Sequence, residues 1–178
     1  LAERDTEIDP PLSKSFEDAG VKAGDIDEIH AELPDFHYAI LRHDRPDTEI
    51  QARFSLPFVM AVCLVHGRLT GKHLADPRAA GEDIWKLIER TKIRQVVPRR
   101  PDMNFDPEQP DSLRVRLISG EVIEESRAFP EGSPNVPVSR ATILAKYAEN
   151  TAPLRVHPDL QSWASSPDLA AFIESVTA

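Results

Sequence analysis

The sequence predicts an α+β fold, a two-layer sandwich in which helices cover a small, mainly antiparallel sheet and a helical extension follows at the C-terminus. Segments with strand periodicity and segments with helical periodicity occur in separate blocks, in the order β, α, α, β, β, β, α, α. This segregation favours an α+β sandwich over a doubly wound fold, in which strands and helices alternate. A length of 178 residues suffices for one domain with a core, and the 16 prolines against 7 glycines predict many stiff connections.

The N-terminal part predicts a tail, a short helix and the first strand. Residues 1–12 are polar and acidic and end in prolines, and residues 13–19 fit a short helix. Apolar and polar side chains then alternate over residues 28–33, which is the periodicity of a strand, and Pro34 ends it. Residues 35–47 carry many polar side chains and predict a loop.

Helices are predicted over the next forty residues or so. Residues 48–66 have the helical period, with an internal restart where Ser55 suits an N-cap and a proline follows in the first turn. Gly67 suits the end of that helix. Further helices are expected after Thr70 and over residues 83–90, where apolar side chains again recur at helical spacing.

Three strands complete the predicted sheet. Residues 93–97 predict one strand, and residues 98–111, with four prolines, predict a surface loop. Residues 113–118 and 122–125 form the clearest hairpin of the sequence, turning at a Ser-Gly pair. In the first hairpin strand the leucines and valine face one side and the two arginines face the other.

Two capped helices are predicted near the C-terminus. Ser139 suits the N-cap of a helix over residues 140–149, and Ser166 with Pro167 suits the start of a last, amphipathic helix. The predicted organisation is therefore a tail with a short helix (residues 1–20), an α+β domain (residues 21–150) and a helical extension (residues 151–178).

Composition excludes several functional classes. The net charge of −9 argues against a nucleic-acid surface, because phosphates require a positive field. Cys63 is the only cysteine, so no intrachain disulfide can form, and its apolar neighbours predict an inert thiol. No stretch reaches the ~20 apolar residues of a membrane span, and no signal peptide is recognisable. We expect a cytoplasmic protein with no nucleic-acid or membrane partner.

Motif searches favour neither a metal site nor a serine nucleophile. The six histidines never occur at i, i+4 on a credible helix, and none has a cysteine nearby. Asp102, Asp106 and Asp111 are separated by prolines that break the spacing of a cation loop. No Gly-x-Ser-x-Gly segment occurs. We therefore predict no metal and no cofactor.

The polar residues around Tyr38 remain as the candidate site. A tyrosine just after a strand can donate a proton or bind a carboxylate, and Arg42, Arg45 and Arg53 can supply a positive field. The alternative is a surface loop whose aromatic side chains, with His37 beside them, cover an edge of the core.

Five segments together resemble the C-terminal α+β domain of the MmgE/PrpD family, whose members include 2-methylcitrate dehydratase, cis-aconitate decarboxylase and iminodisuccinate epimerase. The segments are Gly-Asp-Ile-Asp-Glu-Ile at residues 24–29, Arg-Phe-Ser-Leu-Pro-Phe-Val-Met-Ala at 53–61, the strand and glycine hairpin at 113–120, Pro-Asn-Val-Pro-Val-Ser at 134–139 and Lys-Tyr at 146–147. The resemblance runs from about residue 21 to residue 148, and the last 30 residues fit a family-like C-terminal helical extension.

The resemblance implies a lid domain of a larger enzyme. Family members join a large helical domain to a smaller α+β lid, with a metal-free active site between the two. The lid of some members contributes a tyrosine, which Tyr38 matches here and which we expect to be catalytic. We further expect Arg53, Ser55 and His37 to bind substrate, although helix capping and surface pairing explain Ser55 and Arg53 equally well.

The resemblance also implies what the enzyme does and needs. The expected activity is that of a lyase or isomerase of small di- or tricarboxylates, most like 2-methylcitrate dehydratase, in a homodimer. The family's helical domain and its upstream Lys-x-x-Pro segment have no counterpart here, so a helical domain or subunit must complete the site. The alternative is a non-catalytic binding or assembly module that keeps the lid fold.

Overall fold

The structure is a computed structural model, and it describes residue 16 and residues 20–152 of the chain. The chain divides into two compact units, Leu1–Pro130 (unit 1) and Glu131–Ala178 (unit 2). The division falls before the helix predicted over residues 140–149, whereas the sequence predicts boundaries after residues 20 and 150. These predicted domain boundaries stay predictions.

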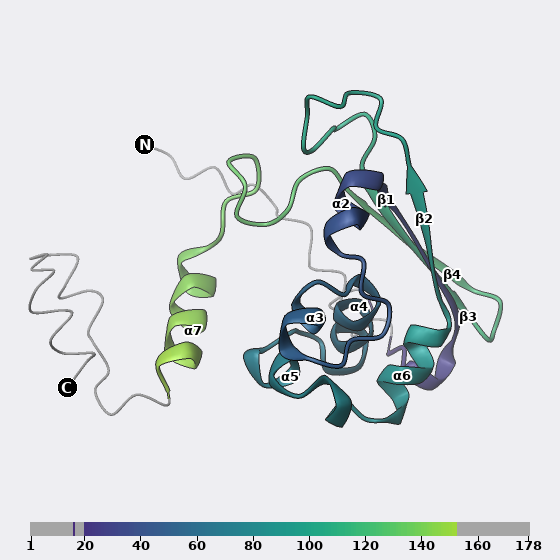
Figure 1. The fold of residues 1–178 in the computed structure, drawn as a ribbon, viewed down its shortest axis with the longest axis vertical. Helices are drawn as coiled ribbons and strands as arrows, with labels where there is room; N and C mark the ends of the chain where they lie inside the picture. Colours follow the sequence, from purple (N-terminus) through teal and green to yellow (C-terminus); the bar gives the residue numbers. More distant parts are fainter. Residues whose placement is uncertain (1–15, 17–19, 153–178) are drawn as a thin grey trace, which may run out of the picture. The chain divides into compact units, whose positions relative to one another are not determined.

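Unit 1 is built on a four-stranded sheet in the order β2-β1-β3-β4 (Figure 1). The strands are β1 (Ile26–Pro34), β2 (Thr91–Val96), β3 (Asp111–Leu117) and β4 (Val122–Arg127). β1 pairs in parallel with β2 and antiparallel with β3, and β3 pairs antiparallel with β4. The predicted small, mainly antiparallel sheet is therefore confirmed, as is the α+β class.

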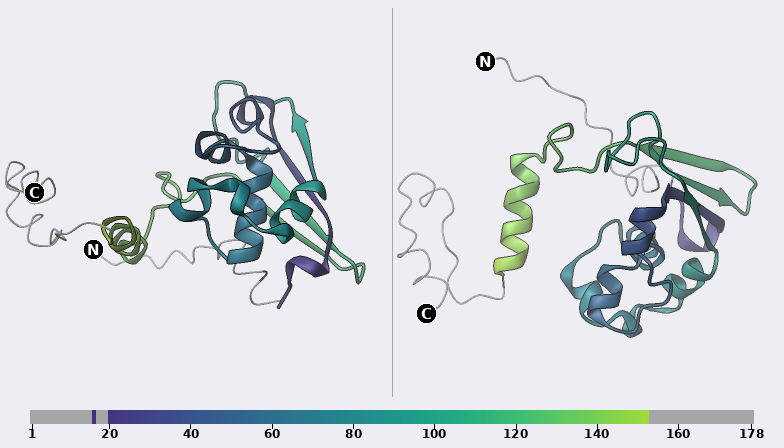
Figure 2. Two further views of the ribbon diagram at one scale, coloured as in Figure 1. Left: turned by 60° about the horizontal axis from the view of Figure 1, so that its bottom comes forward. Right: turned by 45° about the horizontal axis from the view of Figure 1, so that its top comes forward.

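Helices of unit 1 lie on one face of this sheet (Figures 1 and 2). The α-helices are α2 (Asp35–Ile40), α3 (Glu49–Arg53), α4 (Leu56–His66), α5 (Gly71–Ala75) and α6 (Glu82–Glu89), and two short 3₁₀ turns are η1 (Ala23–Asp25) and η2 (Pro77–Ala79). The two layers are those of the predicted sandwich.

The core lies between the sheet and the helices. Ile29 of β1 and Val115 of β3 are opposite each other in the register and fully buried, and they meet Phe58 of α4 and Leu87 of α6 in one cluster. Each such side chain contributes about 1.5–3 kcal/mol when it leaves water. The side chains predicted to alternate in the first strand and in the first strand of the hairpin thus point in turn to the core and to solvent.

The break predicted inside residues 48–66 is present and separates α3 from α4. The Ser55 side chain accepts a hydrogen bond from the Phe58 backbone N–H at 3.3 Å, and a proline follows in the first turn. Gly67 ends α4 with φ of 74°, a left-handed conformation that favours glycine. These are the capping interactions that the sequence predicts.

The loop predicted over residues 35–47 is wrong at its start, because α2 occupies Asp35–Ile40. Pro34 precedes the helix with φ of −56°, which suits a helix start, and Asp35 favours the positive end of the helix dipole. The prediction gave too much weight to the polar side chains, whereas Pro34 does end the strand, as predicted, and the helix begins directly after it. His37 and Tyr38 therefore lie on a short helix.

Unit 2 contains one described helix, α7 (Arg140–Thr151). Its predicted cap is confirmed, because the Ser139 side chain accepts a hydrogen bond from the Thr142 N–H at 3.0 Å. Two apolar side chains of this helix are exposed, Ile143 at 53% and Leu144 at 37%. The predicted last helix starting at Ser166 lies outside the described residues. So does the helix predicted over residues 13–19, except the buried, helical residue 16.

Candidate functional site

The candidate residues His37 and Tyr38 lie on α2, directly after β1 ends at Pro34. Consecutive helix residues point about 100° apart, so the two side chains leave the helix in different directions. The structure accordingly gives them different neighbours. The two side chains therefore have different polar partners, although they are adjacent in the sequence.

Tyr38 is held by an acidic side chain. Its hydroxyl donates a hydrogen bond to Oδ1 of Asp44 at 3.1 Å. Partial burial, and then this carboxylate, raise the pKa of Tyr38 above its ordinary value. The phenol is therefore protonated at neutral pH and has a proton to donate.

His37 lies instead near the start of β3. Its Nδ1 is 3.9 Å from Oδ2 of Asp111, and the imidazole side chain is only 18% exposed. Burial raises the pKa of the Asp111 carboxyl group, and the nearby His37 acts in the opposite direction. The rings of Phe36 and Phe105 flank the imidazole, with centroids 4.3 Å and 5.5 Å away.

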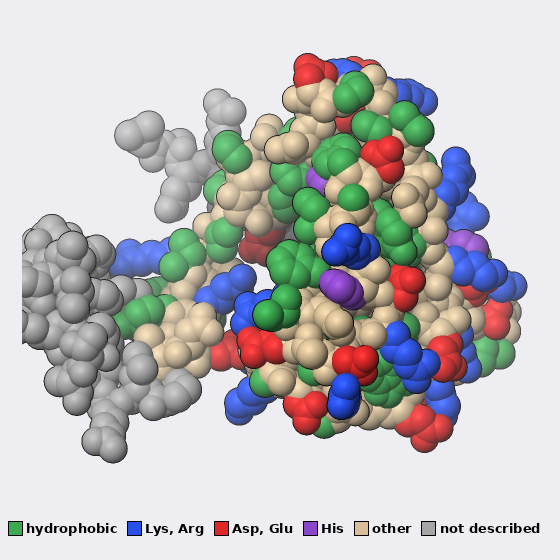
Figure 3. Space-filling view, in the orientation of Figure 1, with side chains coloured by type: hydrophobic (Ala, Val, Ile, Leu, Met, Phe, Trp, Pro, Cys, Tyr) green, Lys and Arg blue, Asp and Glu red, His purple; other side chains and the backbone are tan. Residues whose placement is uncertain are grey.

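His37 and Asp111 line an open groove of about 450 Å³ on the helical side of the sheet. Much of the rest of its lining is apolar, from β1, β3, α4, the residue after α2 and the connection between β2 and β3. The apolar lining residues are Ala31, Leu33, Leu41, Leu56, Met60, Phe105 and Leu113. Figure 3 views this side of the molecule and shows hydrophobic side chains among polar ones over the region of α2. Tyr38 does not line the groove.

The connection that carries Phe105 is fixed by an ion pair. Arg100 donates hydrogen bonds to the buried Asp106 carboxylate, with Nε to Oδ2 at 2.9 Å, and the Glu108 backbone N–H adds a third at 2.9 Å. The Arg100 guanidinium holds the pKa of Asp106 below its usual range. Phe105 is thus attached to an anchored loop beside His37.

Ser55 and Arg53 are close to this region in the chain but are already engaged. Ser55 is fully buried and caps α4, so its hydroxyl is not presented at the surface. Arg53 pairs with Glu49 one turn earlier on α3. Their predicted substrate contacts stay predictions, and neither side chain lines the groove.

The arginines predicted to give a positive field have different environments. Arg45 pairs with Glu89 at 3.4 Å and its guanidinium lies 5.1 Å from the ring centroid of Trp85. Arg42 has no ion pair within the part of the chain that the structure describes. A backbone bridge joins Arg42 to Ser55 and brings the segment after α2 beside the start of α4.

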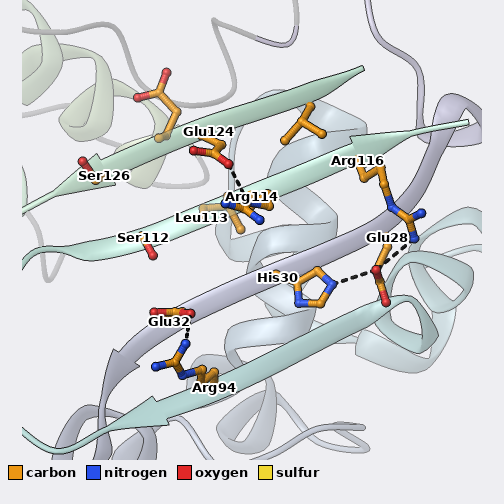
Figure 4. Close-up of a pocket in the computed structure, with 12 residues that line it drawn as sticks. Glu28, His30, Glu32, Arg94, Ser112, Leu113, Arg114, Arg116, Glu124 and Ser126 are labelled. Atoms are coloured by element: carbon orange, nitrogen blue, oxygen red, sulfur yellow. Dashed lines mark hydrogen bonds and ion pairs between the residues drawn. The ribbon is translucent and has the colours of Figure 1, made fainter. Parts of the chain in front are cut away.

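The opposite face of the sheet is open and charged (Figure 4). His30 lies 2.7 Å from a carboxylate oxygen of Glu28, which also pairs with Lys92 and Arg116. Further cation–carboxylate pairs, Arg94–Glu32 and Arg114–Glu124, cross neighbouring strands. This face therefore neutralises most of its own charge.

Sequence reasoning missed Asp111, Phe105 and Asp44 as members of the site. Asp111 stands at the border of the predicted loop and strand, and only the pairing of β1 with β3 brings it to His37. Asp44 could have been found from the sequence, because it lies six residues after Tyr38 in the same polar segment. Nothing in the sequence pointed to Phe105.

Two wider searches cover the described residues only. Within residue 16 and residues 20–152, no group of three or more His, Cys, Asp or Glu side chains is placed to hold a metal ion. In the same part of the chain no helix is long and apolar enough to cross a membrane.

Cys63 lies on α4 and is partly buried. Burial raises the pKa of its thiol above the ordinary value.

Comparison with known proteins gives two matches. The sequence profile of the MmgE/PrpD C-terminal domain matches residues 12–162. A stretch of 23 residues is 96% identical to part of the DNA-directed RNA polymerase subunit beta' of Synechococcus sp. (strain CC9605). That stretch is 13% of this chain and 2% of the polymerase subunit, too short a part of either to indicate a shared fold or activity.

Proposed function

Because this chain belongs to the MmgE/PrpD family, as the match over residues 12–162 shows, we propose that it is the C-terminal part of a lyase or isomerase acting on a small di- or tricarboxylate. The most fitting reaction is the dehydration of 2-methylcitrate or a similar hydroxy acid. A helical domain, in the same gene product or a separate subunit, completes the enzyme. The proposed enzyme is a cytoplasmic homodimer that requires neither a metal nor a cofactor.

The observation that carries this proposal is the placement of Tyr38. It lies on α2 immediately after β1, and its hydroxyl is protonated and oriented by Asp44 at 3.1 Å. A family resemblance implies a tyrosine of the lid at a strand end, and a phenol that stays protonated can donate to a substrate once its hydroxyl turns from Asp44. Tyr38 is therefore the residue to which we assign proton delivery or carboxylate binding.

The chemistry needs groups of the kinds found here. Dehydration removes a proton from the carbon next to a carboxylate and returns a proton to the departing hydroxyl group. The negative charge that develops on the carboxylate is stabilised by cations or hydrogen-bond donors. Arg42 is exposed and has no ion pair within the described residues, so its guanidinium is available for a substrate carboxylate.

Apolar side chains around α2 support completion by another domain. Ile40, Ile50 and Phe54 are 57%, 70% and 41% exposed, on α2, on α3 and between α3 and α4. Clusters of exposed apolar side chains mark surfaces that a partner covers. We assign this surface to the helical domain, whose arrival also closes the candidate site.

The test is dehydration of 2-methylcitrate, followed by the ultraviolet absorbance of the unsaturated product. The assay uses the chain alone and the chain with a family helical domain supplied in trans. Activity is expected only in the mixture, and Tyr38→Phe is expected to lower kcat by about 10²–10⁴. The matched control is Tyr147→Phe on α7, which should leave kcat unchanged.

Full activity of Tyr38→Phe in the mixture would exclude the catalytic assignment of this residue. Binding of the helical domain without turnover of any di- or tricarboxylate would favour the other hypothesis, a non-catalytic assembly module. The two hypotheses share the exposed apolar surface around α2, so turnover distinguishes them and association does not.

A further inference from the structure

We propose that His37 and Asp111 form a proton-transfer pair in the groove. His37 exchanges a proton with the ligand, and Asp111 is a positioning residue that orients the imidazole ring. The reaction in which the pair takes part rests on the proposed function. The pairing itself is a property of this chain and can be tested without turnover.

The geometry leaves one ring nitrogen available. Asp111 Oδ2 is 3.9 Å from His37 Nδ1, within reach of an ion pair and longer than a hydrogen bond. Hydrogen bonds of catalytic groups are often long before substrate arrives and shorten in the complex. When Nδ1 faces the carboxylate, Nε2 remains for a second partner.

The surroundings suit an acid–base group. The His37 side chain is 18% exposed, and the rings of Phe36 and Phe105 restrict its movement. The Asp111 side chain is 47% exposed, so the carboxylate is accessible from the groove while the imidazole is enclosed. The other charged residues that line the groove are Glu32, Glu125 and Arg127.

The anchored connection between β2 and β3 supports the pair. Arg100 and the buried Asp106 fix the turn that carries Phe105, and β3 begins at Asp111, a few residues later. Both the aromatic wall and the carboxylate therefore come from one stretch of chain. His37 comes from α2, and the two meet at the same end of the sheet.

The proton balance of the proposed step is simple. Neutral Nε2 of His37 takes a proton from the carbon next to the substrate carboxylate, and the electron pair of the broken C–H bond forms a C=C bond as the C–O bond breaks. The His37 imidazolium then gives this proton to the departing hydroxyl group, which leaves as water, and the imidazole returns to its neutral form. Asp111 stabilises the imidazolium while it carries the proton.

A second histidine–carboxylate pair provides the matched control. His30 lies 2.7 Å from Glu28, but on the open face of the sheet, where Glu28 also binds Arg116 (Figure 4). Lys92 pairs with Glu28 as well. His30 is 42% exposed and does not line the groove. An effect common to any histidine near a carboxylate would appear there as well.

The first experiment records the imidazole NMR signals of the histidines in this chain, because the nitrogen shifts report which ring nitrogen carries the proton. The signals of His37 are those that His37→Gln removes. In Asp111→Asn the nitrogen shifts of His37 are expected to change, because the carboxylate that faces Nδ1 is gone. His30→Gln should leave the His37 signals unchanged. Unchanged His37 signals in Asp111→Asn would overturn the pairing.

The second experiment measures kcat and KM with the helical domain supplied. His37→Gln is expected to lower kcat strongly and Asp111→Asn to lower it less, with KM changing much less than kcat in both. His30→Gln should show wild-type kcat and KM. A wild-type kcat in Asp111→Asn would overturn the positioning role of Asp111, and a wild-type kcat in His37→Gln would overturn the proton transfer. Wild-type enzyme inactive on every carboxylate would refute the proposed function, while the NMR spectra would still decide the pairing.

Discussion

Single side chains give the two faces of the sheet different properties. His37 and His30 each lie near a carboxylate, but His37 is enclosed by two aromatic rings beside an apolar groove, and His30 lies on an open charged surface. Charged pairs on an open surface contribute little to stability because water and salt screen them. The pKa of one of these groups, the Glu28 carboxyl, is nevertheless lowered in the folded state.

Glu28 offers a pH prediction. Hydrogen bonds from Lys92 and then His30 lower the pKa of Glu28 to about 2. Because the pKa is lower in the folded state, the stabilisation from this group is present above the unfolded value near 4.3 and is lost as pH falls towards 2. Between pH 5 and pH 2, Glu28→Gln should therefore lose less stability than the wild type in urea unfolding.

The control for Glu28→Gln is Glu124→Gln, which removes a carboxylate from the same face that pairs with Arg114. Equal acid sensitivity of Glu28→Gln and the wild type would contradict the prediction. High salt should reduce the difference between them, because exposed pairs are screened.

Sequence patterns could find some members of the site and not others. Tyr38 and His37 were accessible because they follow a recognisable strand in a polar segment. In the sequence Asp111 resembles only a cation ligand, and the neighbouring prolines exclude that role. Its partner in space is fixed by strand pairing between β1 and β3, which alternation of side chains does not reveal.

Helices and strands were predicted best where local chemistry decides them. The break between α3 and α4 follows from a capping serine and a proline, and the hairpin of β3 and β4 follows from alternation around a Ser-Gly turn. The short helix α2 was missed because its six residues contain no complete apolar repeat. Its formation depends on packing at the end of the sheet.

Ser55 tests how far capping stabilises α4. Ser55→Ala removes the acceptor of the Phe58 N–H at a fully buried position, and we expect the free energy of unfolding to fall by about 1–2 kcal/mol. Urea unfolding followed by circular dichroism measures it. The matched variant is Ser139→Ala, which removes an exposed cap from α7 and should cost less.

A loss below a few tenths of a kcal/mol in Ser55→Ala would contradict the capping role. In the completed enzyme the same variant separates two hypotheses for Ser55. A structural cap lowers stability with little change in KM, whereas a substrate contact raises KM.

Over all of unit 1, the two layers share one core. The buried cluster takes side chains from β1, β3, α4 and α6. The sequence predicts this layering, because strands and helices occur in separate blocks. It does not predict the order of the strands, since β1 lies between β2 and β3 and pairs in parallel with one and antiparallel with the other. A shared core implies that helices and sheet unfold together.

Leu87→Ala tests that cooperativity. Leu87 is 1% exposed on α6, and its truncation should lower the free energy of unfolding by about 2–5 kcal/mol through lost burial and a residual cavity. Circular dichroism and the fluorescence of the tryptophans, including Trp85 two residues away, should show coincident transitions at lower urea concentration. Separate transitions for the two signals would show that the helical layer melts before the sheet.

The strand order has a consequence for solubility. Within the described residues β2 and β4 are the outer strands of the sheet, so each has one side without a neighbouring strand. Such edges invite strands of other chains to add to them, and charged side chains discourage it. β2 carries Lys92 and Arg94, and β4 carries Glu124, Glu125 and Arg127. Both edges are thus protected against intermolecular sheet extension, whatever covers the helical side.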